Sequence, residues 1–409
     1  MTLQTELTQR FSDGLGDWDL ARLGLAVSGG GDSIALLRLA VSWARANSVS
    51  LFVYTVNHGL RPEAASEVAF VADLCEALDV PHRSLVWTGW DGSGNLSQDA
   101  RNARYRLIAE AAIRDQVPVI ALGHTQDDRA ETVLMALSRR SGVDGLAGMA
   151  PWRTAQGVTW ARPLLGTTRA ELRAYLGHIG QTWIDDPTNE DTRFERVRMR
   201  NAKASLDALG LTADALADVA QHMQSVQTTL RDITRGARQG ICTPTGGAVR
   251  MDREKFQSQP AEIRRRLMVD ALRFVAPSAG APRKDAVASL LATSQSASLA
   301  GCLVLFKPKA VWITREPNAV KGVECPIEDV WDGKWRVFGK KAGHDLVIRA
   351  LGENGLKSFP DWREVALPRQ VLLTSPAIWQ GARLIDAPLL SESREWSAEL
   401  LFGKEVFHS

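Results

Sequence analysis

Cysteine is scarce in this chain, and no two cysteines are spaced as a ligand pair. Four cysteines are scattered over 409 residues without a C-x-x-C motif, which argues against a disulfide framework and against a zinc site. No apolar run is long enough to span a membrane, and the first residues lack the basic-then-apolar order of a signal peptide. We therefore expect a cytoplasmic protein with no membrane partner.

A large excess of either charge is also absent. The formal net charge is only +2, which by itself says nothing about a nucleic-acid partner. The distribution is uneven, because residues 231–285 hold twelve basic and six acidic side chains. Such a segment, if helical, fits either a contact with phosphate groups or an ordinary solvated surface, and the sequence leaves both open.

Two common phosphate-binding patterns are missing from the glycine-rich segment S-G-G-G-D-S at residues 28–33. It has no Gly-Lys-Ser/Thr ending, which excludes the P-loop of γ-phosphate hydrolases, and no G-x-G-x-x-G spacing, which argues against a dinucleotide site. The apolar run 23–27 before it predicts a buried strand, and residues 34–37 after it begin a helix. A strand, a glycine turn and a helix start form an anion site, because backbone N–H groups and the helix dipole point at the anion.

This segment resembles the pyrophosphate loop, S-G-G-x-D-S, of enzymes that split ATP into AMP and pyrophosphate. A helix start that only needs capping is the alternative, but capping requires just one glycine or one polar residue. We expect ATP to be bound by Ser28, Gly29, Gly30, Gly31, Asp32 and Ser33.

Strands and helices alternate through the first 140 residues, after a short amphipathic helix within residues 1–20. We predict strands at 22–27, 50–56, 82–87 and 117–122, and helices at 33–46, 62–79, 97–115 and 126–139. This alternation predicts an α/β fold with a Rossmann-like parallel sheet covered on both faces. Loops 28–32, 57–61 and 123–128 leave the carboxyl ends of strands, so they should face one crevice.

The alternation stops near residue 200, and three domains are predicted at 1–205, 206–316 and 317–409. The middle domain is expected to be mostly helical, with helices at 213–233, 261–274 and 283–292 and a hairpin at 303–306 and 310–313. The small C-terminal domain is expected to be α+β and rich in strands from about residue 330, including 346–349 and 371–373.

A second polar segment, residues 123–132, leaves a strand and starts a helix. Thr125 can cap this helix, and Asp128 and Glu131 are three residues apart, so both carboxylates share one face at the crevice mouth. Acidic residues stabilise the first turn of any helix. Beside a phosphate site, however, carboxylates can also bind Mg²⁺, hold a cationic substrate or accept a proton.

With this segment the chain resembles the bacterial tRNA(Ile)-lysidine synthetases, a family of pyrophosphate-loop ATPases. The matching motifs follow in family order over residues 20–201. They are S-G-G-G-D-S (28–33), N-H-G-L-R (57–61), A-R-N-A-R-Y (100–105), G-H-T-Q-D-D-R-A-E-T (123–132), S-G-V-D-G-L-A-G-M (141–149), R-P-L-L (162–165), D-P-T-N (186–189) and F-E-R-V-R-M-R (194–200). The family usually has Asp where this chain has Asn57.

The resemblance implies an ATP-dependent ligase that joins free L-lysine to C2 of the wobble cytidine of an isoleucine tRNA with a CAU anticodon. An adenylated cytidine is the intermediate, and the product lysidine changes the codon read from AUG to AUA. It further implies Mg²⁺ as cofactor and tRNA contacts by the middle and C-terminal domains. A homodimer is left open.

The resemblance also implies roles for single residues. Catalytic roles fall to Asp32, which would hold Mg²⁺, and to Asp128 and Glu131. The last two would recruit the lysine ammonium, and one would take its proton. The lysine site would further include Arg104 and His124, for which a surface ion pair and a core histidine are the alternatives. Arg196 and Arg200 would meet AMP or tRNA, unless they are merely solvated.

Other protein classes also contain a pyrophosphate-loop ATPase half and are alternatives to this interpretation. A tRNA sulfurtransferase would need paired cysteines or an iron–sulfur site, and Cys75 offers neither. An amidotransferase would need a glutaminase nucleophile, which is missing because Thr2 follows the initiator methionine. A non-catalytic nucleotide-binding or RNA-binding module would not need Asp32, Asp128 and Glu131 together.

Overall fold

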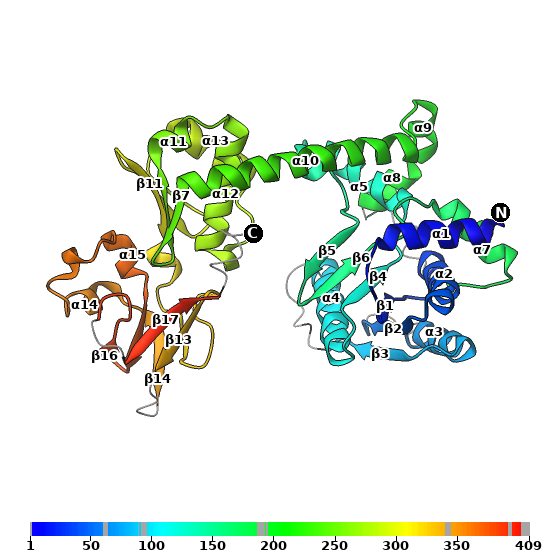
Figure 1. Cartoon of the computed structure of the whole chain (residues 1–409), viewed down its shortest axis with the longest axis horizontal. Helices are drawn as coiled ribbons and strands as arrows, with labels where there is room; N and C mark the ends of the chain where they lie inside the picture. Colours follow the sequence, from blue (N-terminus) through cyan, green and yellow to red (C-terminus); the bar gives the residue numbers. More distant parts are fainter. Residues whose placement is uncertain are drawn as a thin grey trace. The chain divides into compact units, whose positions relative to one another are not determined.

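The computed structural model describes residues 2–59, 64–88, 90, 96–185, 193, 195–339, 345–391 and 395–401. The chain forms two compact units, Met1–Gln227 and Thr228–Ser409, and the boundary falls within helix α10 (Figure 1). The three domains predicted from the sequence stay a prediction.

The first unit is built on a six-stranded sheet in the order β3-β2-β1-β4-β6-β5. Its strands are β1 (Arg22–Ala26), β2 (Ser50–Asn57), β3 (His82–Val86), β4 (Val119–Leu122), β5 (Trp152–Ala155) and β6 (Val158–Ala161). All neighbours pair in parallel except β5 and β6, whose antiparallel hairpin was not predicted. In chain order, β2 and β3 are added on one side of β1, and β4 is then added on the other side. The carboxyl ends of β1 and β4 therefore flank the point where ligands bind in open α/β sheets.

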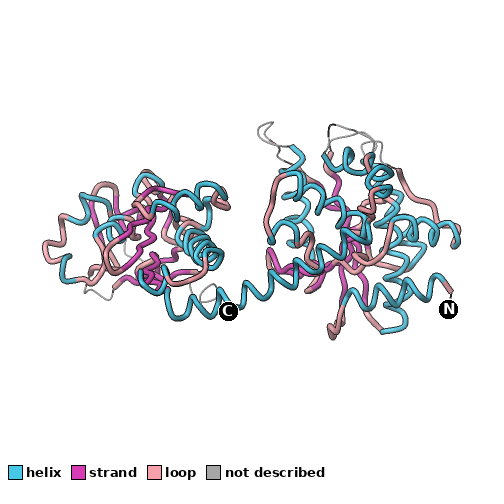
Figure 2. Tube along the Cα trace, turned by 90° about the horizontal axis from the view of Figure 1, so that it is seen from above, coloured by secondary structure: helices cyan, strands magenta, loops and turns pink. Residues whose placement is uncertain are grey.

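Helices cover both faces of this sheet (Figure 2). The helices that begin in the first unit are α1 (Leu3–Leu15), α2 (Gly31–Asn47), α3 (Ala64–Leu78), α4 (Leu96–Arg114), α5 (Gln126–Ser138), α6 (Val143–Leu146), α7 (Arg169–His178), α8 (Glu195–Asn201), α9 (Lys203–Ala208) and α10 (Ala213–Ile241). The α/β fold predicted from the alternation is confirmed. The predicted strands and helices of the first 140 residues are all present, with ends shifted by a few residues.

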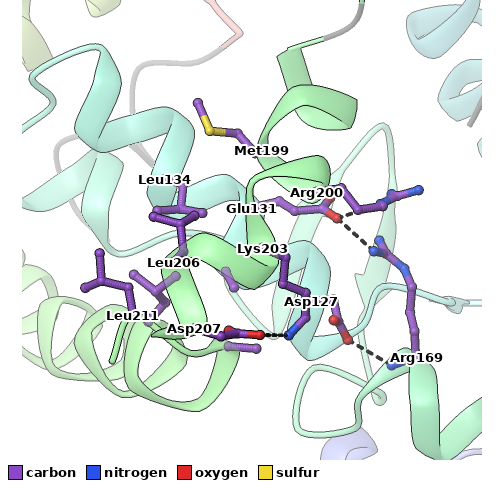
Figure 3. Close-up of a pocket in the computed structure, with 13 residues that line it drawn as sticks. Asp127, Glu131, Leu134, Arg169, Met199, Arg200, Lys203, Leu206, Asp207 and Leu211 are labelled. Carbon is purple, nitrogen blue, oxygen red and sulfur yellow. Dashed lines mark hydrogen bonds and ion pairs between the residues drawn. The ribbon is translucent and has the colours of Figure 1, made fainter. Parts of the chain in front are cut away.

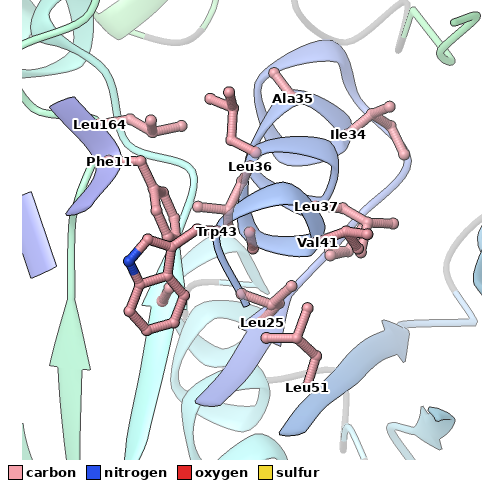
Figure 4. Packing of buried hydrophobic residues seen from close by; sticks show 14 of the residues in the cluster. Phe11, Leu25, Ile34, Ala35, Leu36, Leu37, Val41, Trp43, Leu51 and Leu164 are labelled. Carbon is pink, nitrogen blue, oxygen red and sulfur yellow. The ribbon is translucent and has the colours of Figure 1, made fainter. Parts of the chain in front are cut away.

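Alternation along the strands divides the core of the first unit. On one face Leu23 and Leu25 of β1 pack with α1, α2 and α7, where Phe11 and Trp43 meet edge to face (Figure 4). On the other face Tyr54 and Trp160 pack with Ile108 of α4. Successive side chains of a strand point to opposite faces, so both faces must be apolar when helices cover both.

The second unit holds three antiparallel sheets of five, four and two strands. Its elements are β7 (Cys242–Thr245), β8 (Ala248–Asp252), α11 (Arg253–Gln257), α12 (Ala261–Val275), α13 (Lys284–Thr293), β9 (Ala297–Leu299), β10 (Cys302–Phe306), β11 (Ala310–Arg315), β12 (Glu324–Pro326), β13 (Trp335–Gly339), β14 (Leu346–Ala350), α14 (Gly352–Leu356), α15 (Arg369–Leu373), β15 (Pro376–Gln380), β16 (Arg383–Asp386) and β17 (Trp396–Leu400). The predicted hairpin is β10–β11.

One prediction in the second unit is wrong. The apolar run at 371–373 was expected to be β-like, but it lies in helix α15, which starts after Pro368. Val371, Leu372 and Leu373 are all buried there, so a helix with one apolar side was indistinguishable from a buried strand by composition. No helix in the described part of the chain has the length and apolarity needed to cross a membrane.

Candidate active site

The predicted pyrophosphate loop links β1 to the N-terminus of α2. The α2 N-cap is Gly30, and no side chain caps the helix. The first helical N–H groups, those of Gly31 and Asp32, have no acceptor within the helix and carry its positive end. Ser33 Oγ donates to the Gly30 carbonyl at 2.8 Å and accepts from the Ser28 N–H at 3.2 Å, which closes the turn. The loop is thus folded as an anion cradle.

Glycine is favoured in this loop by the backbone conformation at Gly29. Gly29 has φ +92°, which side chains rarely tolerate, and its carbonyl accepts from the Ile184 N–H at 3.0 Å. The indole of Trp183 lies 3.4 Å from where a Cβ of Gly31 would be. A Cβ on Gly123, after β4, would lie 3.0 Å from the carbonyl oxygen of Asp32. The loops after β1 and β4 therefore touch, as the sequence predicted.

The second polar segment begins α5 with a capping box. Thr125 is the N-cap, its hydroxyl accepts from the Asp128 N–H, and Asp128 Oδ2 accepts from the Thr125 N–H at 2.9 Å. Because the cap fixes Asp128 and the helix places Glu131 one turn later, both carboxylates face the same way. Asp128 and Glu131 are buried, with 7% and 5% of their surface exposed. Buried carboxylates need partners.

Their main partner is Arg169, which the sequence did not suggest. Its guanidinium donates to Glu131 Oε1 at 2.7 Å, to Asp128 Oδ1 at 2.5 Å and to Asp32 Oδ2 at 3.2 Å. Its backbone N–H donates to Asp127 Oδ2 at 2.8 Å (Figure 3). One side chain thus joins the carboxylate of the phosphate loop to the two carboxylates of α5. We call Asp32, Asp128 and Glu131 the acidic cluster.

The pKa values of the two aspartates in the acidic cluster are shifted in opposite directions. Burial raises the pKa of Asp32 above its usual value, and the attraction of Arg169 only partly offsets this, while Asp128 adds repulsion. Burial would also raise the pKa of Asp128, but Arg169 and the Thr125 N–H outweigh it and hold that pKa low. Asp128 is therefore ionised at neutral pH.

Arg196 and Arg200 also meet the acidic cluster. Arg200 Nε donates to Glu131 Oε1 at 3.1 Å, and Arg196 Nε lies 3.5 Å from Glu131 Oε2. Arg196 is also 3.9 Å from Asp128 Oδ1. Both arginines lie on α8, four residues apart and on one face, as their spacing predicted. Within the described residues, Glu131 Oε2 accepts no hydrogen bond.

His124, two residues after the end of β4, is half-buried and electrically neutral. Its Nδ1 accepts from Arg162 Nε at 3.2 Å, so a neutral ring carries its proton on Nε2. Burial, aided by the nearby Arg162, lowers the pKa of His124 to about 3 despite the attraction of Asp128. Arg162 itself is fixed by the Ala150 carbonyl at 2.7 Å.

Arg104 lies in a basic neighbourhood. Burial, together with the charges of Arg101 and Arg196, lowers its pKa, although Tyr105 opposes the shift. Its guanidinium lies 5.8 Å from the Tyr105 ring centre. No ion pair of Arg104 occurs among the residues that the structure describes. A half-buried guanidinium among other cations favours an anionic ligand.

Asn57 makes a contact that either Asn or Asp could make. Its Oδ1 accepts from the Gly59 N–H at 2.8 Å, where Gly59 has φ +63°, which is a local Asx turn. The change from the usual Asp is therefore compatible with the turn. Residues 60–61, 186–189 and 194 of the matching motifs lie outside the described residues.

A small cavity of about 40 Å³ lies beside Glu131 and Arg169 (Figure 3). Apolar side chains from α5, α8, α9 and the segment leading into α10 form its wall, namely Ala130, Leu134, Met199, Leu206, Leu211 and Leu216. Lys203 and Asp207 pair at 2.9 Å on its rim. The volume suits a few water molecules and not an amino acid.

No cluster of three or more metal-ligating side chains is found among the described residues. Asp32 lies in the first turn of α2, and 28% of its side chain is exposed.

Arg169 was missed although the sequence held a signal for it. Residues 168–171 read T-R-A-E, a capping box that starts α7 with Thr168 as N-cap. An arginine at the first helical position opposes the helix dipole, so it calls for nearby anions. Which anions these are cannot be inferred from spacing, since Asp32 and Glu131 are 137 and 38 residues away.

The basic segment 231–285 in the second unit is only partly a surface. Arg238 and Arg266 are buried; Arg238 lies 3.9 Å from Asp270, and Arg266 donates to Glu262 at 2.8 Å. The exposed cations are Arg231, Arg235, Lys255, Arg273, Arg283 and Lys284. The expectation of one basic face is therefore reduced to these.

Comparison with known proteins shows which family this chain resembles. Residues 2–204 match a family described as a PP-loop domain. A tRNA(Ile)-lysidine synthase of Ruegeria pomeroyi is 44% identical over 391 residues, which cover 95% of this chain and 93% of the relative. A tRNA(Ile)-lysidine synthase of Rhodopseudomonas palustris is 42% identical over 261 residues, which cover 63% of this chain and 75% of the relative.

Among solved structures, a U34-tRNA thiolase of Methanococcus maripaludis matches with a TM-score of 0.48 and 15% identity, over 55% of this chain and 79% of that one. The family resemblance of the motifs is confirmed by the relatives of nearly full length. This chain belongs to the tRNA(Ile)-lysidine synthase family, whose N-terminal half is a PP-loop ATPase domain.

Proposed function

We propose that this protein joins free L-lysine to C2 of the wobble cytidine in the CAU anticodon of an isoleucine tRNA. In the first step cytidine O2 bonds to the α-phosphorus of ATP and pyrophosphate leaves. In the second step the lysine ε-nitrogen bonds to C2, the C2–O bond breaks and AMP leaves with that oxygen. Adenylation is needed because the exocyclic carbonyl oxygen on C2 is by itself a poor leaving group.

The phosphates of ATP are assigned to the loop between β1 and α2. Backbone N–H groups of Gly29, Gly30 and Gly31 would hold them, with the hydroxyls of Ser28 and Ser33. Mg²⁺, if bound through Asp32 and the phosphates, would offset phosphate charge. The fold of the loop as an anion cradle supports this assignment.

The lysine ε-amine must lose a proton before it attacks. From an ordinary pKa of about 10.4, that loss costs roughly 4–5 kcal/mol at pH 7. We assign the proton to Glu131, because its Oε2 accepts no hydrogen bond among the described residues. Both oxygens of Asp128 are engaged by Arg169 and Thr125, so Asp128 would attract the ammonium without taking the proton.

The lysine carboxylate is assigned to Arg104, whose surroundings are cationic. His124 would offer its Nε2–H to the carboxylate or to a phosphate. Arg196 and Arg200 would meet AMP or the tRNA backbone when the acidic cluster releases them. The middle domain, 206–316, and the C-terminal domain, 317–409, would carry the rest of the tRNA contacts, in the cytoplasm. A homodimer stays a prediction.

One observation supports this function most. The phosphate loop after β1 and the carboxylates of α5 after β4 lie at one end of the sheet, and a single guanidinium contacts both. An enzyme that couples ATP cleavage to attack by an amine needs an anion cradle and ionised carboxylates within one site.

The test is transfer of radiolabelled lysine to an isoleucine tRNA transcript. We expect incorporation only with ATP and only when the wobble base is cytidine. The Glu131→Gln variant should lower lysine transfer by about 10²-fold or more, because it removes the proton acceptor. Pyrophosphate release without lysine should persist.

The control is Glu110→Gln, which removes a carboxylate that pairs with Arg106 on the surface of α4. It should transfer lysine at the wild-type rate. An unchanged lysine KM and turnover in Glu131→Gln would contradict the assigned role, and absence of incorporation by the wild type would contradict the function.

A further inference from the structure

Among the residues that the structure describes, Arg169 is the one side chain that contacts all three members of the acidic cluster. The carboxylates come from α2 and α5, and Arg169 comes from α7, so three elements converge on its guanidinium. Arginine stays protonated at any physiological pH and offers five donors in a rigid fork. Only 17% of its side chain is exposed, so these ion pairs are poorly screened by solvent.

The backbone of Arg169 is held firmly. Thr168 and Glu171 form the capping box of α7, and the Arg169 N–H donates to Asp127. Leu172 and Tyr175 of α7 belong to the same buried core as α2, against which α7 packs. Since α2 begins at the phosphate loop, Arg169 is fixed to the element that holds ATP in the proposed function.

The acidic cluster is compensated in charge. Three carboxylates face Arg169, Arg196 and Arg200, so formal charges of −3 and +3 meet there. Other charged and titratable groups nearby are Arg101, Arg104, His124, Asp127, Arg162, Arg173, Lys203 and Asp207. A bare triple carboxylate would bind an ammonium tightly and oppose loss of its proton.

We propose that Arg169 is a positioning residue for the reaction. Its guanidinium orients the three carboxylates and offsets enough of their charge that a bound lysine ammonium can release its proton to Glu131. This inference rests on the proposed function. It adds a residue and a reason why carboxylates that attract the lysine do not trap it in its charged form.

The test compares Arg169→Gln and Arg169→Lys with the wild type. In Arg169→Gln the cluster gains net negative charge, so the lysine KM should stay equal or fall, while kcat falls about tenfold to a hundredfold. The kcat–pH profile should move up by about one pH unit, because the ammonium holds its proton more strongly. Arg169→Lys keeps the charge but not the fork, so its profile should match the wild type at a lower kcat.

The control is Arg106→Gln, which removes a positive charge from the surface of α4 and should leave kcat, KM and the profile unchanged. A lower kcat in Arg169→Gln with an unshifted profile would overturn the inference, as would a profile shift in Arg169→Lys. If Arg169→Gln does not fold, Arg169→Lys alone decides. If the wild type is active and one of these two contrary outcomes is found, only the role of Arg169 is refuted. If the wild type itself transfers no lysine, the proposed function is refuted as well.

Discussion

At the scale of single residues, the surroundings of a side chain set its pKa more than its residue type does. Asp32 and Asp128 are both buried aspartates, yet the pKa of one is raised and that of the other is lowered. The difference arises because Asp128 is closed into a capping box and takes the shorter contact of the Arg169 fork. His124 is a third case, held neutral by burial and by Arg162.

His124 should make the folded protein sensitive to acid. Its folded pKa of about 3 lies below the unfolded value of 6.5, so between these values the unfolded chain binds a proton that the folded chain does not. The free energy of unfolding should therefore fall as the pH is lowered through this window, by roughly 2–4 kcal/mol between pH 6.5 and 4.

His124→Asn removes that proton uptake. Urea unfolding at pH 7, 5.5 and 4 should show a smaller acid-induced loss of stability in the variant than in the wild type. Parallel losses in the two proteins would contradict the assignment of a neutral ring to His124.

At the scale of elements, helix starts position the chemistry. The first turn of α2 faces the expected phosphates, that of α5 carries Asp128, and that of α7 carries Arg169. Two of the three have capping boxes. A cap fixes the backbone of the first helical turn, so the side chains of that turn are held in defined positions.

Thr168→Ala should therefore affect both stability and activity. Loss of the N-cap hydroxyl is expected to lower the free energy of unfolding by about 1 kcal/mol. Lysine transfer should also fall, because Arg169 is the next residue. Urea unfolding and the labelled-lysine assay measure the two effects.

The matched variant is Thr168→Ser, which keeps an acceptor at the same place. It should restore both properties nearly to the wild type. A Thr168→Ala protein with wild-type stability and turnover would show that the cap does not fix Arg169.

At the scale of the whole molecule, buried charged side chains connect the elements of the second unit to one another. Lys334 Nζ donates to the Gly247 carbonyl at 3.1 Å and to the Val275 carbonyl at 2.6 Å. Nearby, Arg315 and Asp332 form a bidentate pair at 2.8 Å. These contacts tie the segment after β12 to the five-stranded sheet and α12.

Lys334 should give the second unit a dependence on alkaline pH. Burial lowers the pKa of Lys334 from 10.5 to about 8, although Asp332 opposes the shift. Between pH 8 and 10.5 the unfolded chain holds the proton that the folded chain has released, so the free energy of unfolding rises with pH in that window. The full window corresponds to about 3 kcal/mol.

Lys334→Met should abolish this rise. Urea unfolding followed by tryptophan fluorescence at pH 7.5 and 9.5 should show that the wild type gains stability relative to the variant. An equal pH response in both proteins would mean that the buried amine does not titrate in this window.

Much of the first unit follows from the order of residues along the chain. Alternation of apolar runs and helical patterns predicts β1–β4 and α2–α5, since both depend on local periodicity. Glycines and polar residues at strand ends predict which loops meet. The hairpin β5–β6 was not predicted because β5, W-R-T-A, is short and mostly exposed and so carries no apolar run. Helix α15 was predicted wrongly because a short apolar run fits a strand or a helix equally well.

The sequence by itself determined the phosphate loop, the carboxylates of α5 and the family, because each is written in adjacent residues. Only the tertiary structure decided that Arg169 joins Asp32, Asp128 and Glu131, and that Arg238, Arg266 and Lys334 are buried. The physical reason is that ion pairs and burial depend on which distant segments pack together, whereas helix starts and glycine turns depend on neighbours along the chain.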